Sequence, residues 1–560
     1  MNTLDVDRRT VRAAVFNHLA GIAVAPTVSA LWERGALELL AEAPGPVAFD
    51  DLVSRTHANR GYLRVALRLL MSCGWMRSHA GDEGFGSYVL TREGRLALML
   101  VPPLYSDVVS VFLPKALLLD EYLFGTSDEP VRELLAELVQ RSKERWRIAP
   151  HTDPVTEAVR DRVRRHLDGL LVGPAMVALA RRGVFSRLAQ GAVDLRSIEG
   201  NHASLGSIVD LLAAQDWVVR EGETVQLTGR GRYAAQIAAA YGVTVSYLPL
   251  FTALSTLIFG NARIPRVDAN GFETLVNRSM NVWGSGGAHK TYFGEVEELI
   301  VELFNQPLPL QPQGICDMGC GDGTLLVHLF EVVKQRTARG RALDRHPLIL
   351  VGADINKVAR RVTKQTLHKA GIPVFHVIYG DINRPAQLAS ELEQLGHDIH
   401  DLLHIRSFLD HNRPYLQLAN YVPGTRRAKS TGAFAYLGDE IPAEELEENL
   451  VRHLRRWAPY IGRFGLIVLE LHTLPPDVTA GNLDLTPAVA YDGTHGYSDQ
   501  YLVELPVFLE CAREAGLQTD ARFQRQFPPS ELATVSVNFF TLAHGGTPAS
   551  GTLARQYALG

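Results

Sequence analysis

The 560-residue chain has few cysteines and no excess of charge of either sign, and both shortages exclude classes of protein. Its four cysteines are too few for a disulfide framework and favour a reducing compartment, so we expect a cytoplasmic protein. Lys and Arg number 56 against 61 Asp and Glu, and the net charge of -5 gives the whole chain no electrostatic affinity for nucleic acid.

Long apolar runs are also missing. No uninterrupted run approaches the roughly 20 residues that span a bilayer, and the charged first residues lack the apolar core of a signal sequence. We therefore expect no membrane insertion and no secretion. What is present is a globular composition, with 46% apolar and 21% charged residues, in a chain long enough for about two to four domains.

The first half of the chain contains an imperfect internal repeat. The segment ALWERGALELLAEAP resembles ALARRGVFSRLAQGA, and in each copy an apolar helical segment follows and ends near Trp75 or Trp217. A charged turn, a short strand and the motif LTREGR or LTGRGR close each copy. Three helices before a two-stranded wing are typical of a winged-helix unit. We therefore predict a mainly α-helical region, with a first winged-helix-like unit and connecting helices in residues 1–140 and a second unit in residues 141–255.

Winged helices often bind DNA, but the helix before each wing is dominated by Leu, Val and Ala rather than by polar residues that contact base edges. We therefore expect no nucleic-acid partner and favour a dimerisation and substrate-covering module ahead of a catalytic domain. Residues 256–290 are rich in Gly, Asn and Ser, which predicts a linker or lid segment with ordered loops. Its GSGGAH run is either a hinge or a backbone that approaches a ligand.

The strongest motif, GICDMGCGDGT, lies in the predicted catalytic domain, residues 291–560. A short apolar strand ends at Asp317 and a glycine-rich turn leads into a helix. Glycines let the backbone turn sharply and approach a ligand, while a helix N-terminus supplies free N–H groups. A glycine loop alone is weak evidence, because nicotinamide and flavin sites use related loops.

The carboxylate before the first glycine resembles the first motif of class I S-adenosylmethionine-dependent methyltransferases. Two further apolar strands end in the acidic residues Asp354 and Asp381, which in that family hold the ribose hydroxyls and contact the adenine. The resemblance implies a Rossmann-like α/β domain with a seven-stranded sheet, closed by a hairpin of DARFQRQFP and SVNFFTLAHG, and S-adenosylmethionine as cofactor. The implied cofactor-binding residues are Asp317, Gly319, Gly321, Gly323, Asp354, Ile355, Asp381, Ile382 and Ser407.

Candidate catalytic residues follow the fourth and fifth predicted strands. The segment FLDHNRP falls where winged-helix O-methyltransferases carry a catalytic histidine, so the resemblance implies His411 as general base; the alternative is a histidine that hydrogen-bonds its own loop. Glu470 and His472 lie two residues apart on a strand and face the same side. Glu470 could orient a histidine and His472 could line the acceptor pocket, or both could bond to loop backbone.

The dense polar segment THGYSDQYLVE supplies the candidate substrate-binding residues His495, Tyr497 and Gln500, although Ser498 could simply cap a helix. Some proteins with this signature bind one transition-metal ion that acts as a Lewis acid. The resemblance makes His411 and Gln500 the candidate ligands, although the sequence contains no compact metal-ligand spacing.

Four segments indicate a particular group of methyltransferases: HIRSFLDHNRPY, GDEI, LELHTL and HGYSDQYLVE. They resemble the C-methyltransferase domains of modular polyketide synthases, of the kind found in apratoxin-type loading modules and β-branching modules. The resemblance implies methylation, at the alpha carbon or a β-branch, of an intermediate bound to an acyl carrier protein as partner. The alternatives are a small-molecule O-methyltransferase of secondary metabolism and a non-catalytic or DNA-binding regulator that retains the fold. Pairing of the chain into a homodimer stays open.

Overall fold

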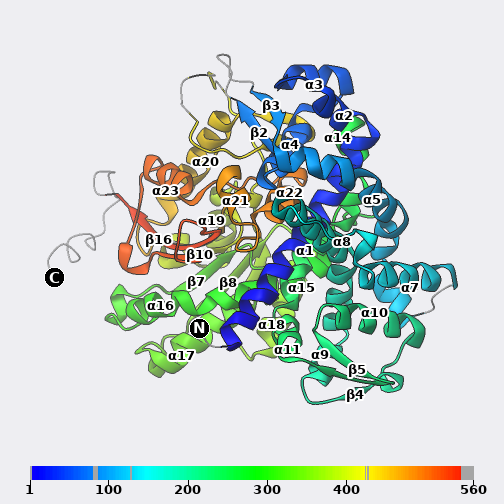
Figure 1. Cartoon of the computed structure of the whole chain (residues 1–560). Helices are drawn as coiled ribbons and strands as arrows, with labels where there is room; N and C mark the ends of the chain where they lie inside the picture. The colour runs from blue at the N-terminus through cyan, green and yellow to red at the C-terminus, as the bar shows by residue number, and fades with distance from the viewer. Residues whose placement is uncertain are drawn as a thin grey trace. The chain divides into compact units, whose positions relative to one another are not determined.

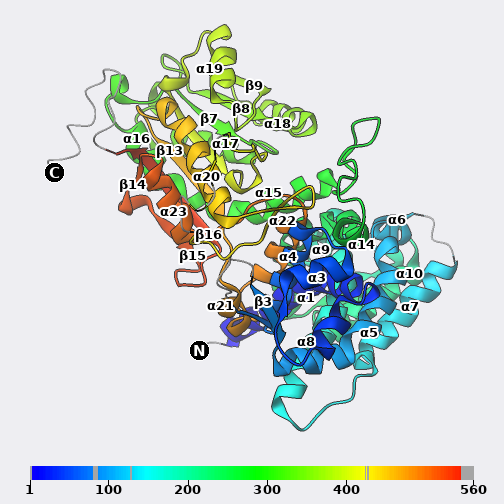
Figure 2. The same ribbon diagram turned by 90° about the horizontal axis from the view of Figure 1, so that it is seen from above.

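The structure is a computed structural model, and it describes residues 3–79, 86–125, 129–419, 421–422, 424 and 428–543. The chain forms two compact units (Figure 1, Figure 2). Unit 1 consists of Met1–Ser285, Ala433–Ile441 and Pro475–Asp499, and unit 2 of Gly286–Gly432, Pro442–Leu474 and Gln500–Gly560. Two segments from the catalytic half of the sequence therefore belong to the N-terminal unit.

Unit 1 is mainly helical and contains both copies of the repeat. The first copy comprises α2 (Ala36–Glu42), β1 (Val47–Ala48), α3 (Phe49–Thr56), α4 (Arg60–Ser72), β2 (Met76–His79) and β3 (Ser87–Leu90). The second comprises α9 (Val184–Leu188), β4 (Val193–Asp194), α10 (His202–Ala214), β5 (Val218–Glu221) and β6 (Thr224–Leu227). Each predicted two-stranded wing gains a third, two-residue strand, β1 or β4, from the preceding loop. Residues 80–85 of the first charged turn lie outside the described residues.

Other helices surround the two copies. A long helix precedes each copy, α1 (Thr3–Glu33) or α8 (Pro154–Arg181), and α5 (Arg92–Ala116) or α11 (Gly229–Gln236) follows it. The remaining elements are α6 (Leu119–Phe124), α7 (Glu129–Lys143), α12 (Gly242–Ser246), α13 (Leu248–Thr252), α14 (Leu254–Phe259), β11 (Phe434–Tyr436), β12 (Asp439–Ile441), α21 (Pro476–Gly481) and α22 (Ala488–Tyr497).

The closing motifs LTREGR and LTGRGR build the same structure twice. In each, the threonine caps the following helix by accepting a hydrogen bond from the glycine three residues later, Gly94 at 3.0 Å or Gly231 at 2.9 Å. A Cβ on Gly94 would lie 1.8 Å from the carbonyl oxygen of Trp75, and one on Gly231 would lie 1.7 Å from that of Trp217. Only glycine fits there, so this close approach explains why the motif recurs.

The long helices α1 and α8 cross with reciprocal contacts. A Cβ on Gly21 of α1 would lie 2.2 Å from the carbonyl oxygen of His166 in α8, and a Cβ on Gly169 of α8 would lie 2.3 Å from that of His18 in α1. In a two-fold symmetric pair, residue i contacts residue j and residue j contacts residue i. The two long helices therefore meet as the halves of an internal, approximately two-fold pair.

The side chains of the two histidines repeat this reciprocity. His18 Nδ1 bonds the hydroxyl of Tyr241, which follows the second copy, at 2.8 Å. His166 Nδ1 bonds the hydroxyl of Tyr105, which follows the first copy, at 2.7 Å. Each copy thus supplies the phenol for the other copy's histidine, so the two copies are joined by exchanged contacts within one chain.

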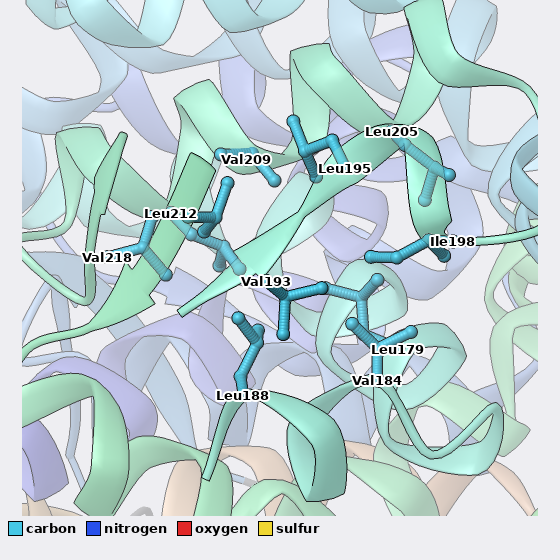
Figure 3. Close-up of a pocket in the computed structure, with 11 residues that line it drawn as sticks. Leu179, Val184, Leu188, Val193, Leu195, Ile198, Leu205, Val209, Leu212 and Val218 are labelled. Atoms are coloured by element: carbon cyan, nitrogen blue, oxygen red, sulfur yellow. The ribbon is translucent and has the colours of Figure 1, made fainter. Parts of the chain in front are cut away.

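The core of the second copy contains a small apolar cavity. Figure 3 shows the side chains around it, which come from the end of α8, from α9 and α10, and from the small sheet. Its volume of about 10 Å³ is only about what one water molecule needs. We therefore regard it as packing space in a hydrophobic core.

Two helices are long and apolar enough to cross a membrane by length and composition: α1, over residues 7–33, and α5. Within α1 the polar residues Asn17 and His18 interrupt the apolar run. In its most apolar stretch, 89% of the residues are buried inside unit 1, against 39% for α5. Core helices have the same composition as membrane spans, and its burial identifies α1 as a core helix.

The glycine-rich run at residues 284–289 lies in the helix α15 (Arg278–Phe293), where composition predicted a loop. Glycine weakens a helix, which is why the composition predicted loop structure here, either as a hinge or as a backbone that approaches a ligand. The helix tolerates glycine here because its backbone passes close to α12: a Cβ on Gly284 would lie 2.5 Å from the Cα of Gly242.

Unit 2 is an α/β unit with a mixed sheet of eight strands, in the order β14-β16-β13-β10-β7-β8-β9, with β15 paired to β16. The parallel strands are β7 (Gly314–Met318), β8 (Ile349–Asp354), β9 (Phe375–Tyr379), β10 (Leu402–Ser407) and β13 (Leu466–Leu471). The antiparallel strands are β14 (Leu517–Thr519), β15 (Arg525–Phe527) and β16 (Val535–Leu542). The helices are α16 (Glu297–Phe304), α17 (Thr324–Arg336), α18 (Lys357–Lys369), α19 (Pro385–Gln394), α20 (Ala443–Trp457) and α23 (Leu505–Glu514).

The prediction of seven strands is corrected to eight. The short strands β14 and β15 share one edge of β16, where β14 pairs with residues 540–542 and β15 with residues 535–537. Pairing of β15 with β16 confirms the predicted closing hairpin, although its last predicted residues, 544 and 545, lie outside the described part. The strand order changes direction at β7, between β8 and β10, and ligands bind at such a switch point in open α/β sheets.

Candidate active site

The glycine loop follows β7 and has the backbone conformation that its composition requires. Gly319, Gly321 and Gly323 all have positive φ angles, between 55° and 81°. A Cβ on Gly319 would lie 2.8 Å from the side chain of Leu409, whereas at Gly321 no atom comes nearer than 4.0 Å. The loop therefore packs against the protein at its start and leaves one face open for a ligand.

The two predicted strand-end carboxylates hold their own turns. Asp354 at the end of β8 accepts hydrogen bonds from the N–H groups of Asn356 at 2.8 Å and Gly321 at 3.2 Å, so the ribose candidate is tied to the glycine loop. Asp381 after β9 accepts one from the N–H of Asn383 at 2.9 Å. These bonds fix both carboxylates at the same edge of the sheet.

The apolar contacts predicted for the adenine differ in exposure. Ile355 is 54% exposed, although it follows a buried strand, and Ile382 is buried. An exposed isoleucine at this edge gains stability when a flat apolar ligand covers it. Ile355 therefore suits a ring contact, while Ile382 belongs to the supporting core.

Among the buried polar atoms without a hydrogen-bond partner in the described part of the chain are Asp317 Oδ1, near the end of β7, and Ser407 Oγ, at the end of the neighbouring strand β10. Burial, followed by the charges of Asp354 and Asp322, raises the pKa of Asp317 to about 8. A cationic ligand with hydroxyl groups would satisfy both atoms and favour the ionised carboxylate. This edge of the sheet thus fits a sulfonium nucleoside.

His411 and Glu470 form a buried pair. The Glu470 carboxylate, at the end of β13, bonds His411 Nδ1 and also accepts the backbone N–H of His411 at 3.1 Å. Only 6% of the His411 side chain and 2% of that of Glu470 is exposed. Two bonds from one carboxylate fix both the loop and the ring, so Glu470 orients the predicted base and directs proton exchange to Nε2.

A second buried network lies beside His411. Asp410 accepts hydrogen bonds from Arg406 at 2.6 Å and His453 at 2.9 Å, and none of the three side chains is more than 1% exposed. Burial alone would raise the pKa of Asp410, but Arg406 and His453 hold it below its usual value. The loop itself begins at Phe408, which has a φ of 56°. The network thus supports a strained loop at the position of the base.

Asn383 joins this network to the adenine side of the site. Its amide nitrogen donates to the carbonyl oxygen of Pro414 at 2.8 Å, and its amide oxygen lies 3.3 Å from His453 Nδ1. Its backbone N–H is the donor to Asp381. Sequence reasoning missed Asn383, Asp410 and His453. These residues come from separate strand and helix ends, so they are far apart in the sequence. The one sequence signal for any of them was that Asp410 directly precedes the predicted base His411.

The structure places His472 in a hydrogen-bonded core position. Its Nε2 bonds Ser536 Oγ at 2.7 Å and its Nδ1 lies 3.2 Å from the carbonyl oxygen of Val503. Burial lowers the pKa of His472 to about 3. This geometry corresponds to the structural alternative of a histidine bonded to loop backbone, and Glu470 pairs with His411 instead.

The three substrate candidates fall in different units. His495 and Tyr497 belong to unit 1, where the Tyr497 hydroxyl bonds Thr27 Oγ1 at 3.1 Å in the hydrophobic core and His495 Nδ1 bonds the carbonyl oxygen of Tyr491 at 2.8 Å. Gln500 is a buried residue of unit 2, like His411. Within the part of the chain that the structure describes, no three His, Cys, Asp or Glu side chains are grouped to hold a metal ion.

Three family models match the chain. The AprA MT2-like domain matches residues 273–538, the AprA N-terminal domain residues 11–78, and the AprA winged helix domain residues 168–261. A curated relative, the 2-ketoarginine methyltransferase of Streptomyces arginensis, is 26% identical over 171 residues. That match covers 29% of this chain and 46% of the relative, so the chain spans about half the length of the curated relative it matches.

Solved methyltransferase structures are similar at low identity. The mitomycin 7-O-methyltransferase MmcR is 12% identical with a TM-score of 0.39, over 69% of this chain and 98% of that one. Human N-acetylserotonin methyltransferase, solved with S-adenosylmethionine, is 12% identical with a TM-score of 0.39, over 71% and 100%. The CurJ carbon methyltransferase is 12% identical with a TM-score of 0.29, over 74% and 98%.

Proposed function

Because the chain belongs to the S-adenosylmethionine-dependent methyltransferases with an AprA MT2-like domain, we propose that it methylates a carbon atom of an acyl chain bound to an acyl carrier protein. The observation that carries this proposal is the buried His411–Glu470 pair. Methyl transfer to carbon needs a base that removes a weakly acidic proton next to a carbonyl group, and a carboxylate-bound histidine is such a base.

The cofactor would be held by the open glycine loop, by Asp354 at its ribose and by the region of Asp381 at its adenine. When bound, it supplies an electrophilic methyl group on a sulfonium. The neighbouring carboxyl group of Asp317 is then beside a positive charge, which lowers its raised pKa. Ile355, which is 54% exposed, would cover apolar surface of the same ligand.

The chemical step assigns one role to each member of the pair. The acceptor C–H bond breaks with its proton on His411 Nε2, and its electron pair forms the C–C bond to the methyl group. Bound S-adenosylmethionine would supply that methyl group from its sulfonium, and the electron pair of the S–C bond would leave with sulfur in S-adenosylhomocysteine. Glu470 keeps the proton of the neutral ring on Nδ1, so that Nε2 accepts, and stabilises the imidazolium that forms. Burial of both side chains keeps water from competing for the carbanion.

The test uses the whole protein with S-adenosylmethionine carrying a deuterated methyl group and a β-ketoacyl carrier protein. Mass spectrometry should find the label on carbon, in the acid released by thioester hydrolysis. Label found only on the hydroxyl of a small molecule would replace this proposal by O-methylation. A free 2-oxo acid belongs in the panel, because its C–H next to a carbonyl suits the same base and the relative is named for 2-ketoarginine.

Variants separate the roles of the site residues. His411→Ala should lower turnover by roughly 10² to 10⁴ with unchanged cofactor affinity, whereas Asp354→Ala should weaken cofactor binding measured by calorimetry. His400→Ala is the matched control, because this histidine lies in the same unit and is half exposed. Normal turnover of His411→Ala would exclude it as the base. Loss of activity after chelation, restored by one transition metal, would add a metal on His411 and Gln500.

A further inference from the structure

The helix α18 (Lys357–Lys369) differs in charge from the rest of the chain. Between Asp354 and Asp381 the sequence has no acidic residue, although the whole chain has a net charge of -5. The same stretch contains five Lys and Arg residues, all of them on α18: Lys357, Arg360, Arg361, Lys364 and Lys369. A local excess of positive charge therefore occurs in a chain that is negative overall.

The exposed basic residues follow one face of the helix. Lys357, Arg361, Lys364 and His368 are all exposed, at spacings of four, three and four residues, which places them in one row. Among the described residues, none of these four side chains forms an ion pair. Elsewhere in unit 2, exposed arginines are commonly compensated, as Arg452 is by Glu448 one turn away on α20. We call Lys357, Arg361, Lys364 and His368 the α18 stripe.

The α18 stripe begins at the edge of the sheet that holds the site. Asn356 caps α18 by accepting the N–H of Val358 at 2.7 Å, and it lies two residues after the ribose candidate Asp354. The helix packs against β8 and β9 (Figure 2). Thirteen residues extend about 20 Å, so the stripe leads from the rim of the cofactor edge along an outer face of unit 2.

We infer that the α18 stripe is the surface on which unit 2 binds an acidic face of the acyl carrier protein; this rests on the proposed function. Unpaired cations attract an acidic protein, speed its encounter and fix its orientation, and the interaction weakens with salt. A stripe that starts at the cofactor edge would place the carrier where its acyl arm can enter the site. The net negative charge of the whole chain disfavours a long polyanion such as nucleic acid.

The test is direct binding of holo acyl carrier protein to the full chain, together with kinetics. The triple variant Lys357→Glu, Arg361→Glu, Lys364→Glu should bind the carrier at least about tenfold more weakly and lose the salt dependence. Its KM for the carrier-bound substrate should rise by a similar factor. Its KM and kcat for the same acyl group on N-acetylcysteamine, and its affinity for S-adenosylmethionine, should stay unchanged.

The matched control makes the same charge change on exposed arginines of unit 1: Arg34→Glu, Arg55→Glu, Arg77→Glu. Equal weakening by both triple variants, or none by the α18 variant, would overturn the inference. So would a wild-type chain that binds a DNA duplex through the stripe and ignores the carrier. A chain that binds the carrier through the stripe but methylates neither thioester would instead refute the proposed function alone.

Discussion

The two winged-helix copies of unit 1 share one construction but differ in what their third helix contacts. In the first copy, α4 packs against α22 and the β11–β12 hairpin, which come from residues 475–499 and 433–441. In the second copy, α10 packs against α7 and α6, which precede it in the N-terminal half. The two copies thus have the same internal packing, but the corresponding helices α4 and α10 contact different segments of the chain.

Each copy contains an Arg–Asp ion pair, and the two pairs have the same length but differ in how deeply they are buried. Arg68 of α4 bonds Asp492 of α22 at 2.9 Å, with side chains that are only 3% and 4% exposed. Arg220 bonds Asp210 of α10 at the same 2.9 Å, with 27% and 38% exposed. The arginines of α4 therefore bind carboxylates of their own chain, which explains why a helix with several arginines need not bind DNA.

The largest expected effect tests whether the two copies share their internal packing. Gly94→Ala and Gly231→Ala would each place a Cβ inside contact distance of a backbone oxygen, so each should lower the free energy of unfolding by about 4 kcal/mol or more. Urea denaturation measures this. Gly229→Ala is the control, because it lies in the same helix as Gly231 with no atom within 4 Å. A large loss in only one copy would show that the equivalence fails.

The next prediction sharpens the difference between the copies. Arg68→Met leaves Asp492 buried without its main cation and should cost about 3 to 5 kcal/mol. Arg220→Met removes an equally short pair whose side chains are 27% and 38% exposed, and it should lower the free energy of unfolding by less than about 1 kcal/mol. Equal losses in urea denaturation would mean that burial does not decide the contribution of these pairs.

The smallest effect near neutral pH concerns the two exchanged histidines. Burial, followed by nearby positive charge, lowers the pKa of His18 and of His166 from 6.5 to about 3. The unfolded chain therefore binds protons below pH 6.5 that the folded chain does not, so stability is present above 6.5 and is lost as the pH falls towards 3. Between pH 6.5 and 5, each histidine should account for a loss of about 2 kcal/mol in the free energy of unfolding.

The check is a pH series of urea denaturation. His18→Gln and His166→Gln should each reduce the slope of the free energy of unfolding against pH by the same amount. The variant His79→Gln, at an exposed histidine, should leave this slope unchanged. Unequal slopes for the first two variants would contradict the two-fold relation between the copies.

Local parts of the site could be predicted, and their partners could not. The glycine loop and Asp354 follow from a strand that ends in turn residues, and the structure puts both at the switch point of the sheet. The partner of His411 stayed open, because Glu470 lies 59 residues further along the chain. His472 was a catalytic candidate as well, because residues two apart on a strand face the same side. In the structure it bonds Ser536 and the backbone of Val503 instead.

The sequence by itself determined the repeated winged-helix units, the α/β unit, and the glycine loop and carboxylates at one edge of its sheet. These depend on hydrophobic period and on backbone positions that only glycine, threonine or aspartate satisfies, which are properties of short segments. Only the tertiary structure decided that residues 433–441 and 475–499 join unit 1, that Tyr497 lies in its core, and that Glu470 orients His411. Those outcomes depend on which distant segments exclude water together, and short segments carry no record of their distant partners.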